Sequence, residues 1–477
     1  MSSRFLAGVG RCDITPPVGI AHGNWSAQVH ERSEGIDLPL YCTALAASDG
    51  EEEIIMAEWE LLYPPQGEWL RQIRERVTSL TGVPASHIRI SSTHTHSGPN
   101  QKRPWFEGGS EMIEPYIASL SDKLASACWT AHRSLRPARI AGGKGHSAVN
   151  CNRRKVVQGR TILAPDPAGY SDHEVGVIRI DEDGGKPLAV LVNFAAHPTI
   201  LAWNNRLLSP DYPGTVRRTV ESIVGGTCLF LQGAAGNQNT VRDYSCRVED
   251  ARWIGKQVGL EASRVAESIE TQPSTLEITS YVESSWTMGV AERKPAGEVE
   301  AEVRCISRKV PLPLWRREPP SAAEIAHLRE LERNLAQLRE QSAPEAEIRE
   351  ANRLARRATL DLRIAEQRCQ GAALELEFQA MRMGPVALIG IPVEPFAEIG
   401  AAVKQASPFA TTFYSGYTNG VHNYLPVRSA YDEGGYEVWM TPFAPEAAEL
   451  TITRSLELLQ ELAGGRPAVA AAPYHQS

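Results

Sequence analysis

The stretch LPLYCTALAASDGEEEIIMAEWEL, residues 38–61, predicts a β-hairpin, because two strand-like apolar runs flank the turn signal Asp49-Gly50. Apolar residues then recur at helical spacing over residues 66–80, which predicts a helix. Residues 87–90 form a further short apolar run with strand character. The order strand, strand, helix, strand predicts a mixed α/β core.

The same alternation continues along the chain. A second hairpin is predicted over residues 175–195, a buried strand over 227–231 and a helix over 248–269. The polar run 150–154, NCNRR, follows a Gly-rich stretch and predicts a loop. The expected fold class is therefore mixed α+β.

Residues 321–370 differ in kind, since they are rich in Ala, Glu, Arg and Leu with apolar residues three or four apart. This pattern predicts an inserted antiparallel helical hairpin that turns at Ser342-Ala343-Pro344. Two interpretations stay open. The hairpin is an arm packed on the domain, or it is a lid over a site or an arm that joins two copies into a homo-oligomer.

Composition excludes several classes of protein. Hydrophobic residues make up 42% and charged residues 22% of the chain, as in ordinary globular proteins. The net charge of −8 argues against a nucleic-acid partner. No apolar run is long enough for a signal peptide or a bilayer span, so the expectations are a cytoplasmic protein and no stable membrane insertion.

The first motif with chemical content is STHTHSGP, residues 92–99, directly after the predicted strand at 87–90. Side chains of a strand alternate between its faces, so Ser92, His94 and His96 would share one side if the backbone stays extended. Two imidazoles at one point suit a metal ligand beside a proton carrier. A pair of this kind is equally typical of structural histidines, so other features have to decide.

Two further strand ends carry polar side chains. His197 ends the apolar run NFAA, and Glu394 follows the most hydrophobic strand of the C-terminal third, between two prolines. A carboxylate at the end of a buried strand needs a partner, because burying an unpaired charge is costly. A metal ion or an arginine would be a suitable partner for this carboxylate.

Taken in order, five motifs resemble the neutral, non-lysosomal ceramidase family: GVGRCDITPP (8–17), THTHSGP (93–99), FAAHPT (194–199), FLQGAAGNQN (230–239) and the run from Thr418 to Glu437. The resemblance extends from about residue 6 to residue 440. It implies a mixed α/β catalytic domain, with mixed sheets flanked by helices, that holds one zinc ion per chain.

The resemblance also implies roles for single residues. By motif, the zinc ligands are His94, His197, Glu394 and Tyr424, although Tyr414, Tyr417 and Tyr431 lie close to the last of these in sequence. His96 becomes the proton-transfer group. Arg153 and Tyr436 correspond to residues that would stabilise the oxyanion. The weaker candidates are His22, His30, His422, Asp211 and Asn237, for second-shell, pocket or surface positions.

A zinc ion with three or four protein ligands activates water for attack on a carbonyl. The predicted function is thus hydrolysis of an amide bond in a small N-acyl compound. Membrane ceramide is a doubtful substrate, because the chain has no room for the family's extra C-terminal domain and the loops around Asn237 and Leu425 are changed.

Two alternatives remain: an esterase or lactonase that uses the same site, and a non-catalytic binding or scaffold protein. The expected organisation is one domain over residues 1–464, with the hairpin at 321–370 inserted in it and a loosely ordered tail over 465–477.

Overall fold

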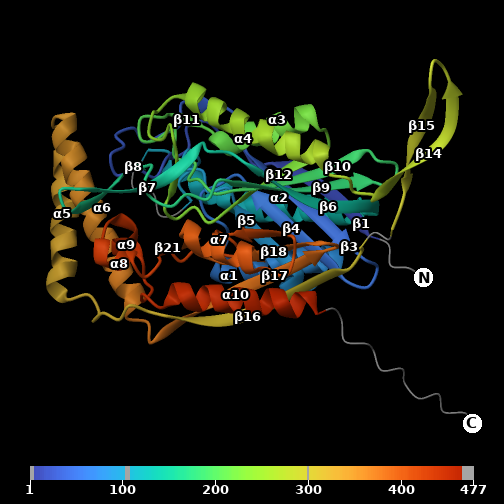
Figure 1. Cartoon of the computed structure of the whole chain (residues 1–477). Coiled ribbons are helices and arrows are strands. Elements are labelled where there is room, and N and C mark those ends of the chain that lie inside the picture. The colour runs from blue at the N-terminus through green and yellow to red at the C-terminus, as the bar shows by residue number, and fades with distance from the viewer. Residues whose placement is uncertain (1–4, 102–107, 298–299, 465–477) are drawn as a thin grey trace, which may run out of the picture.

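Two β-sheets packed face to face, with helices on both outer faces, form the body of the protein in this computed structural model (Figure 1). The structure describes residues 5–101, 108–297 and 300–464. The predicted mixed α/β fold class is confirmed. Among the described residues, no helix has the length and apolar character that crossing a membrane requires.

The larger sheet has eight strands. In spatial order they are β12 (Thr227–Gln232), β10 (Pro187–Phe194), β9 (Glu174–Glu182), β6 (Arg136–His146), β1 (Leu6–Asp13), β3 (Tyr41–Ser48), β4 (Glu53–Trp59) and β5 (Ile88–Ser92). The pairs β10–β12 and β4–β5 are parallel, and the other neighbours are antiparallel. Both faces of β3 are buried, which explains its almost continuous apolar sequence.

Four helices cover the outer face of this sheet: α1 (Gly67–Thr81), α2 (Ile113–Arg133), α3 (Tyr212–Ile223) and α4 (Val248–Ser268). The first two pack over β1 and β3 to β5, and the other two pack over β6, β9, β10 and β12. The predicted hairpins at 38–61 and 175–195 and the predicted helices at 66–80 and 248–269 are confirmed.

The smaller sheet has the strand order β16 (Val303–Pro313), β17 (Ala373–Met383), β18 (Val386–Gly390) and β20 (Thr411–Ser415). Its inner face packs Met381, Leu388 and Phe413 against residues of the larger sheet such as Leu45 and Ile178. Its outer face is covered by α7 (Ala397–Ala406) and α10 (Ala447–Ala463). The result is a four-layer arrangement of helices, sheet, sheet and helices.

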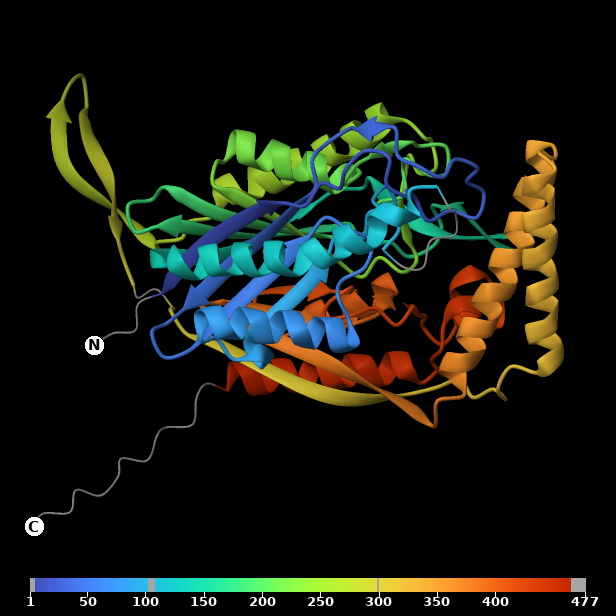
Figure 2. The same ribbon diagram turned by 180° about the vertical axis from the view of Figure 1, so that it is seen from behind.

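The predicted helical hairpin is confirmed as α5 (Ala322–Glu340) and α6 (Glu345–Arg368), which stand side by side at one end of the sandwich (Figure 2). Ser321 and Glu324 form a capping box that starts α5. Every α5 residue is at least partly exposed, whereas α6 buries a stripe that includes Ala355 and Ile364 against the body. The packed-arm interpretation therefore describes α6.

A feature that local patterns did not predict lies at the other end of the molecule. Strands β14 (Ser274–Glu283) and β15 (Thr287–Pro295) form a two-stranded ribbon that projects away from the body (Figures 1 and 2). The single-domain boundaries stay a prediction. The tail assigned to 465–477 lies outside the described residues.

The loop predicted for residues 150–154 is wrong. These residues begin β7 (Asn150–Val157), which pairs with β8 (Arg160–Asp166) and β13 (Gln238–Thr240). The polar side chains are compatible with a buried strand because they find partners inside: the Asn150 amide donates to the Ala195 carbonyl at 2.7 Å.

The remaining short elements are β2 (Gly35–Ile36), β11 (Leu207–Leu208), β19 (Glu394–Pro395), β21 (Tyr424–Leu425), α8 (Ala430–Glu433) and α9 (Tyr436–Met440), with 3-10 turns at Ala85–His87 and Ser110–Met112.

The contact between α2 and β1 generates a stability prediction. A Cβ atom on Gly10 would lie 2.2 Å from the Ala127 carbonyl oxygen, so Gly10→Ala forces the helix away from the sheet. Overpacking of this kind costs about 1–3 kcal/mol. We expect a lower denaturant midpoint for Gly10→Ala. Gly184→Ala is the control, since nothing lies within 4 Å of its added Cβ; equal midpoints for the two variants would contradict this packing.

Candidate metal centre

Three strand ends meet at one end of the sandwich, and each delivers a predicted ligand. His94 follows β5, His197 follows β10 and Glu394 follows β18. β19 pairs in parallel with β21, and this pairing sets Glu394 directly beside Tyr424. The candidate ligands thus come from both sheets, and the four are only 1–5% exposed.

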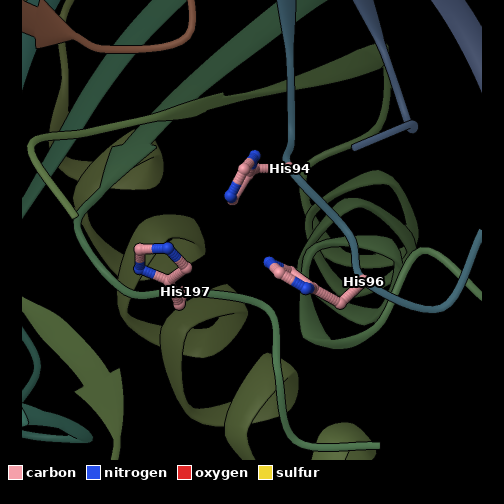
Figure 3. Close-up of side chains that lie close together, drawn as sticks. All are labelled: His94, His96 and His197. Atoms are coloured by element: carbon pink, nitrogen blue, oxygen red, sulfur yellow. The ribbon is translucent and has the colours of Figure 1, made fainter. Parts of the chain in front are cut away.

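The side chains converge closely. Glu394 Oε2 lies 3.5 Å from His94 Nε2 and 3.2 Å from His197 Nε2. Figure 3 shows that the rings of His94, His96 and His197 surround a common point, and a ligating nitrogen of each lies within 4.8 Å of the others. Geometry alone therefore admits His94, His96, His197 and Glu394 as metal ligands.

Backbone carbonyls fix the tautomers of two of these histidines. His94 Nδ1 is 2.8 Å from the Leu62 carbonyl oxygen, and His197 Nδ1 is 2.7 Å from the Ala235 carbonyl oxygen. A carbonyl only accepts, so both Nδ1 atoms carry the proton and both neutral rings present an Nε2 lone pair. Burial lowers the pKa of both histidines well below the ordinary value of 6.5, which favours these neutral rings.

The rings of His94 and His96 do lie close together, with centroids 5.0 Å apart. The extended backbone that was expected to bring them together is wrong. The extended backbone ends at Ser92, and His94 has a φ of 69° in the left-handed region. Its backbone N–H donates to the Leu61 carbonyl at 3.0 Å, which holds this turn. A left-handed conformation at a non-glycine residue is a local strain of the kind that clusters at functional sites.

His96 has a different environment from the other two histidines. Neither of its ring nitrogens has a hydrogen-bond partner among the described residues, and Trp25 packs on the ring with centroids 5.1 Å apart. Burial, followed by the nearby charges of His197 and Arg153, lowers its pKa well below 6.5. A neutral imidazole with free nitrogens in a buried site is suited to proton transfer.

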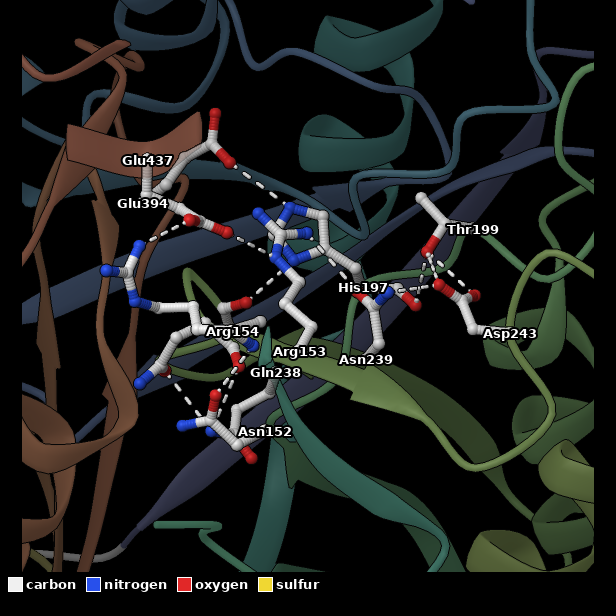
Figure 4. A network of polar contacts seen from close by, with 12 residues as sticks. Asn152, Arg153, Arg154, His197, Thr199, Gln238, Asn239, Asp243, Glu394 and Glu437 are labelled. Carbon is white, nitrogen blue, oxygen red and sulfur yellow. Dashed lines mark hydrogen bonds and ion pairs between the residues drawn. The ribbon is translucent and has the colours of Figure 1, made fainter. Parts of the chain in front are cut away.

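Arg153 lies in a buried polar network beside His197 (Figure 4). Its Nε donates to Glu437 Oε1 at 2.8 Å and its Nη1 to Asn239 Oδ1 at 3.2 Å, and the guanidinium lies 5.4 Å from the Tyr424 ring centroid. Its Nη2 has no hydrogen-bond partner in the described part of the chain. Arg153 does pair with a carboxylate, and it still retains one buried donor.

Of the tyrosines near this position in the sequence, Tyr424 and Tyr417 lie beside the histidines and Tyr431 does not. Tyr424 stacks near His197 at 6.3 Å and contacts the Tyr436 ring at 5.5 Å. Tyr417, also buried, donates its hydroxyl to Glu394 Oε2 at 3.5 Å and lies 4.2 Å from the His94 ring. Tyr417 is thus a second candidate for the tyrosine position. Tyr431 donates to the Phe443 carbonyl, away from the histidines.

The weaker candidates have structural contacts. His22 and His30 are buried against each other at 3.1 Å, and burial lowers the pKa of each to about 4, so a surface position is wrong for both. Asp211 caps α3, and its second oxygen accepts from the Leu201 N–H at 3.2 Å. The Asn237 side-chain amide donates a hydrogen bond to the Glu398 carboxylate at 2.8 Å. His422 lines a surface cavity of about 380 Å³.

Glu437 is a buried side chain beside the candidate site that pattern analysis missed. It is 0% exposed and accepts hydrogen bonds from both Arg153 and Arg154, at 2.8 and 2.7 Å. Periodicity gives no sign of it, since a glutamate in a short helix is normally on the surface. Its place beside Tyr436 in a family-like run was the available signal.

Comparisons with known proteins support one family. Residues 5–272 match the model of the neutral/alkaline non-lysosomal ceramidase N-terminal domain. The neutral ceramidase of Mycobacterium tuberculosis is 24% identical over 96% of this chain and 77% of that protein. The rice (Oryza sativa subsp. japonica) neutral ceramidase is 24% identical over 50% of this chain, and this match spans only 32% of the rice protein.

A solved structure shows the same fold. The crystal structure of neutral ceramidase from Pseudomonas aeruginosa superposes with a TM-score of 0.67 over 99% of this chain and 77% of that chain, at 18% identity. Because the family model covers more than half of the sequence, the chain belongs to the neutral/alkaline non-lysosomal ceramidase family.

Proposed function

We propose that this protein is a zinc-dependent hydrolase that cleaves an amide bond of a small N-acyl compound. One observation carries the proposal: two imidazole Nε2 lone pairs face the same carboxylate oxygen of Glu394 at 3.2 and 3.5 Å. None of these three atoms bears a hydrogen when the histidines are neutral and the carboxylate is ionised. A cation between them removes the repulsion.

The separations fit one ion. Two ligand atoms about 2.1 Å from zinc at a tetrahedral angle lie about 3.4 Å apart, close to both measured distances. Nitrogen and oxygen donors are the ligands that zinc accepts in catalytic sites. The second ring nitrogens donate to backbone carbonyls, as those of metal-ligating histidines commonly do. We propose His94, His197, Glu394 and Tyr424 as ligands.

A zinc ion in this position supplies Lewis-acid activation of water and of a carbonyl group. The protein's own side chains provide the rest. His96 has free ring nitrogens and would carry a proton to the leaving nitrogen, which an amide requires because an unprotonated amine leaves poorly. Arg153 and Tyr436 would stabilise the negative charge that develops on the carbonyl oxygen.

The surroundings favour a small substrate over a lipid held in a membrane. Helix α6 borders the site: Ile364 packs with Tyr424, and Arg356 donates to the Trp25 carbonyl, next to the indole that covers His96. The packed helix α6 therefore forms one wall of the proposed site. The relatives named neutral ceramidases point to an N-acyl compound as substrate.

A cytoplasmic setting is supported by eight free cysteines, because thiols stay reduced in that compartment.

Metal analysis of purified protein tests the site. We expect about one zinc per chain in the wild type and none in His94→Ala, because that variant loses a ligand and its carbonyl-anchored ring. A wild type that is active without metal after chelation and dialysis would overturn the proposal.

His96→Gln is the matched variant for His94→Ala, two residues away in the same motif. It should retain zinc and lose turnover by about 10²–10⁴-fold, since only the proton carrier is removed. Loss of zinc from His96→Gln would instead make His96 a ligand and contradict its assigned role.

A pair of phenylalanine variants separates the two tyrosines. If Tyr424 is a ligand, Tyr424→Phe weakens zinc affinity by more than about tenfold, while Tyr417→Phe, which removes a long hydrogen bond to Glu394, has a smaller effect. Competition with a fluorescent zinc chelator measures both affinities. The reverse order would move the ligand role to Tyr417.

Paired substrates distinguish the proposed amidase from an esterase or lactonase. Short N-acyl amides and the esters of the same acyl groups are assayed with wild type and with His96→Gln. An amidase hydrolyses the amides and depends on His96 more strongly for the amide than for the ester, because an alkoxide leaves without prior protonation more readily than an amine anion. Activity confined to the esters would favour the alternative.

A further inference from the structure

The ribbon formed by β14 and β15, residues 274–295, has no packing partner in the described structure. Its two strands pair only with each other among the described residues, and nearly every residue in them is exposed. Figures 1 and 2 show it projecting from the end of the molecule opposite to α5 and α6. An isolated two-stranded hairpin is marginally stable in water, so such a ribbon calls for a partner.

Large apolar side chains cover the ribbon. Seven of them are 41–80% exposed, with Trp286 in the turn the most exposed: Leu276, Ile278, Tyr281, Val282, Trp286, Met288 and Val290. They occupy both faces. Ile278 lies opposite Ala291, and Tyr281 opposite Gly289, on one face, whereas Val282 lies opposite Met288 on the other.

The exposed apolar area is large for a monomer. Tyr281 and Trp286 are aromatic, a kind of side chain that buries about 150–250 Å² each. With the five exposed aliphatic side chains added, the ribbon offers an apolar area on the order of the roughly 800 Å² that each partner of a stable complex buries. By contrast, the helical hairpin exposes only Ile325 and Leu354 among its large apolar residues, each below 40%. The ribbon is therefore a better candidate for a protein–protein interface than the helical hairpin.

Both positively charged residues of the ribbon are paired locally. Lys294 pairs with Glu277 at 3.0 Å across the strands, and Arg293 pairs with Glu270 at the ribbon's base at 2.5 Å. This leaves no excess of positive charge for an anionic membrane or a nucleic acid. A partner surface should accordingly be apolar and carry no strong net charge, like the ribbon itself.

We propose that the β14–β15 ribbon is the surface through which two copies of this chain associate. A second copy brings the same apolar ribbon, and a symmetric contact between two identical patches is the commonest form of protein association. The pairing buries both faces near the tip and supplies the partner that an isolated hairpin lacks.

A lipid bilayer is the less suitable occupant. Glu283 lies within three residues of Trp286 at the tip, so insertion from the tip would bury a carboxylate in lipid. The ribbon also points away from the end that carries α6 and β21 (Figure 1), so docking there would turn the candidate site away from the membrane.

Sedimentation equilibrium of the full chain tests this inference. We expect a concentration-dependent dimer for the wild type. The combined variant Leu276→Ser, Tyr281→Ser and Trp286→Ser should raise the dimer dissociation constant at least about thirtyfold, the effect of losing one interface hot spot. The control variant Leu80→Ser, Trp129→Ser and Ile223→Ser removes three apolar side chains that are 41–49% exposed on α1, α2 and α3, and it should associate as the wild type does.

A second variant guards against misfolding. Replacing residues 275–294 with a short Gly-Ser linker removes the whole ribbon and leaves both sheets of the body intact, so it should give a monomer with unchanged thermal unfolding. A wild type that stays monomeric, or ribbon variants that associate like the wild type, would overturn the proposal. Flotation of a monomeric wild type with phosphatidylcholine vesicles, lost in the ribbon variants, would assign the ribbon to a membrane and equally overturn it.

Discussion

Three lone pairs meet at one buried point, and strands of both sheets end where they bring these lone pairs together. His94, His197 and Glu394 each present an electron-rich atom to the others in an interior from which water is almost excluded. In such a low-dielectric environment the repulsion and the lost solvation are both costly. A divalent cation would offset both costs, and this is the physical reason for proposing one where these three distant segments meet.

The sheets supply this arrangement through three parallel strand pairs. In the pair β4–β5, the second strand leads to His94 and the first leads to Leu62, whose carbonyl fixes the His94 tautomer. In the pair β10–β12, one strand leads to His197 and the other to its anchor Ala235. In the pair β18–β20, one leads to Glu394 and the other to Tyr417, which donates to that carboxylate. Parallel neighbours end at the same edge, so each proposed ligand lies next to the group that positions its side chain.

Local sequence patterns predicted the hairpins, the amphipathic helices and the helical arm, because burial on one face of each element imposes its period on the sequence. They failed where tertiary contacts override local preference. Residues 150–154 are polar and still form a strand, since Asn150 and Arg153 find buried partners. The left-handed turn at His94 depends on the Leu61 carbonyl, which no spacing rule reveals. The ligand set itself came from resemblance to a family, because residues 94, 197 and 394 are too far apart for any local pattern.

Anomalous diffraction at the zinc edge from crystals of the purified protein locates the metal and identifies its ligands. We predict a single strong peak about 2.0–2.2 Å from His94 Nε2, His197 Nε2 and Glu394 Oε2, with His96 outside bonding distance. A peak bonded to His96 and remote from Glu394, or no peak in crystals of fully active enzyme, would contradict it.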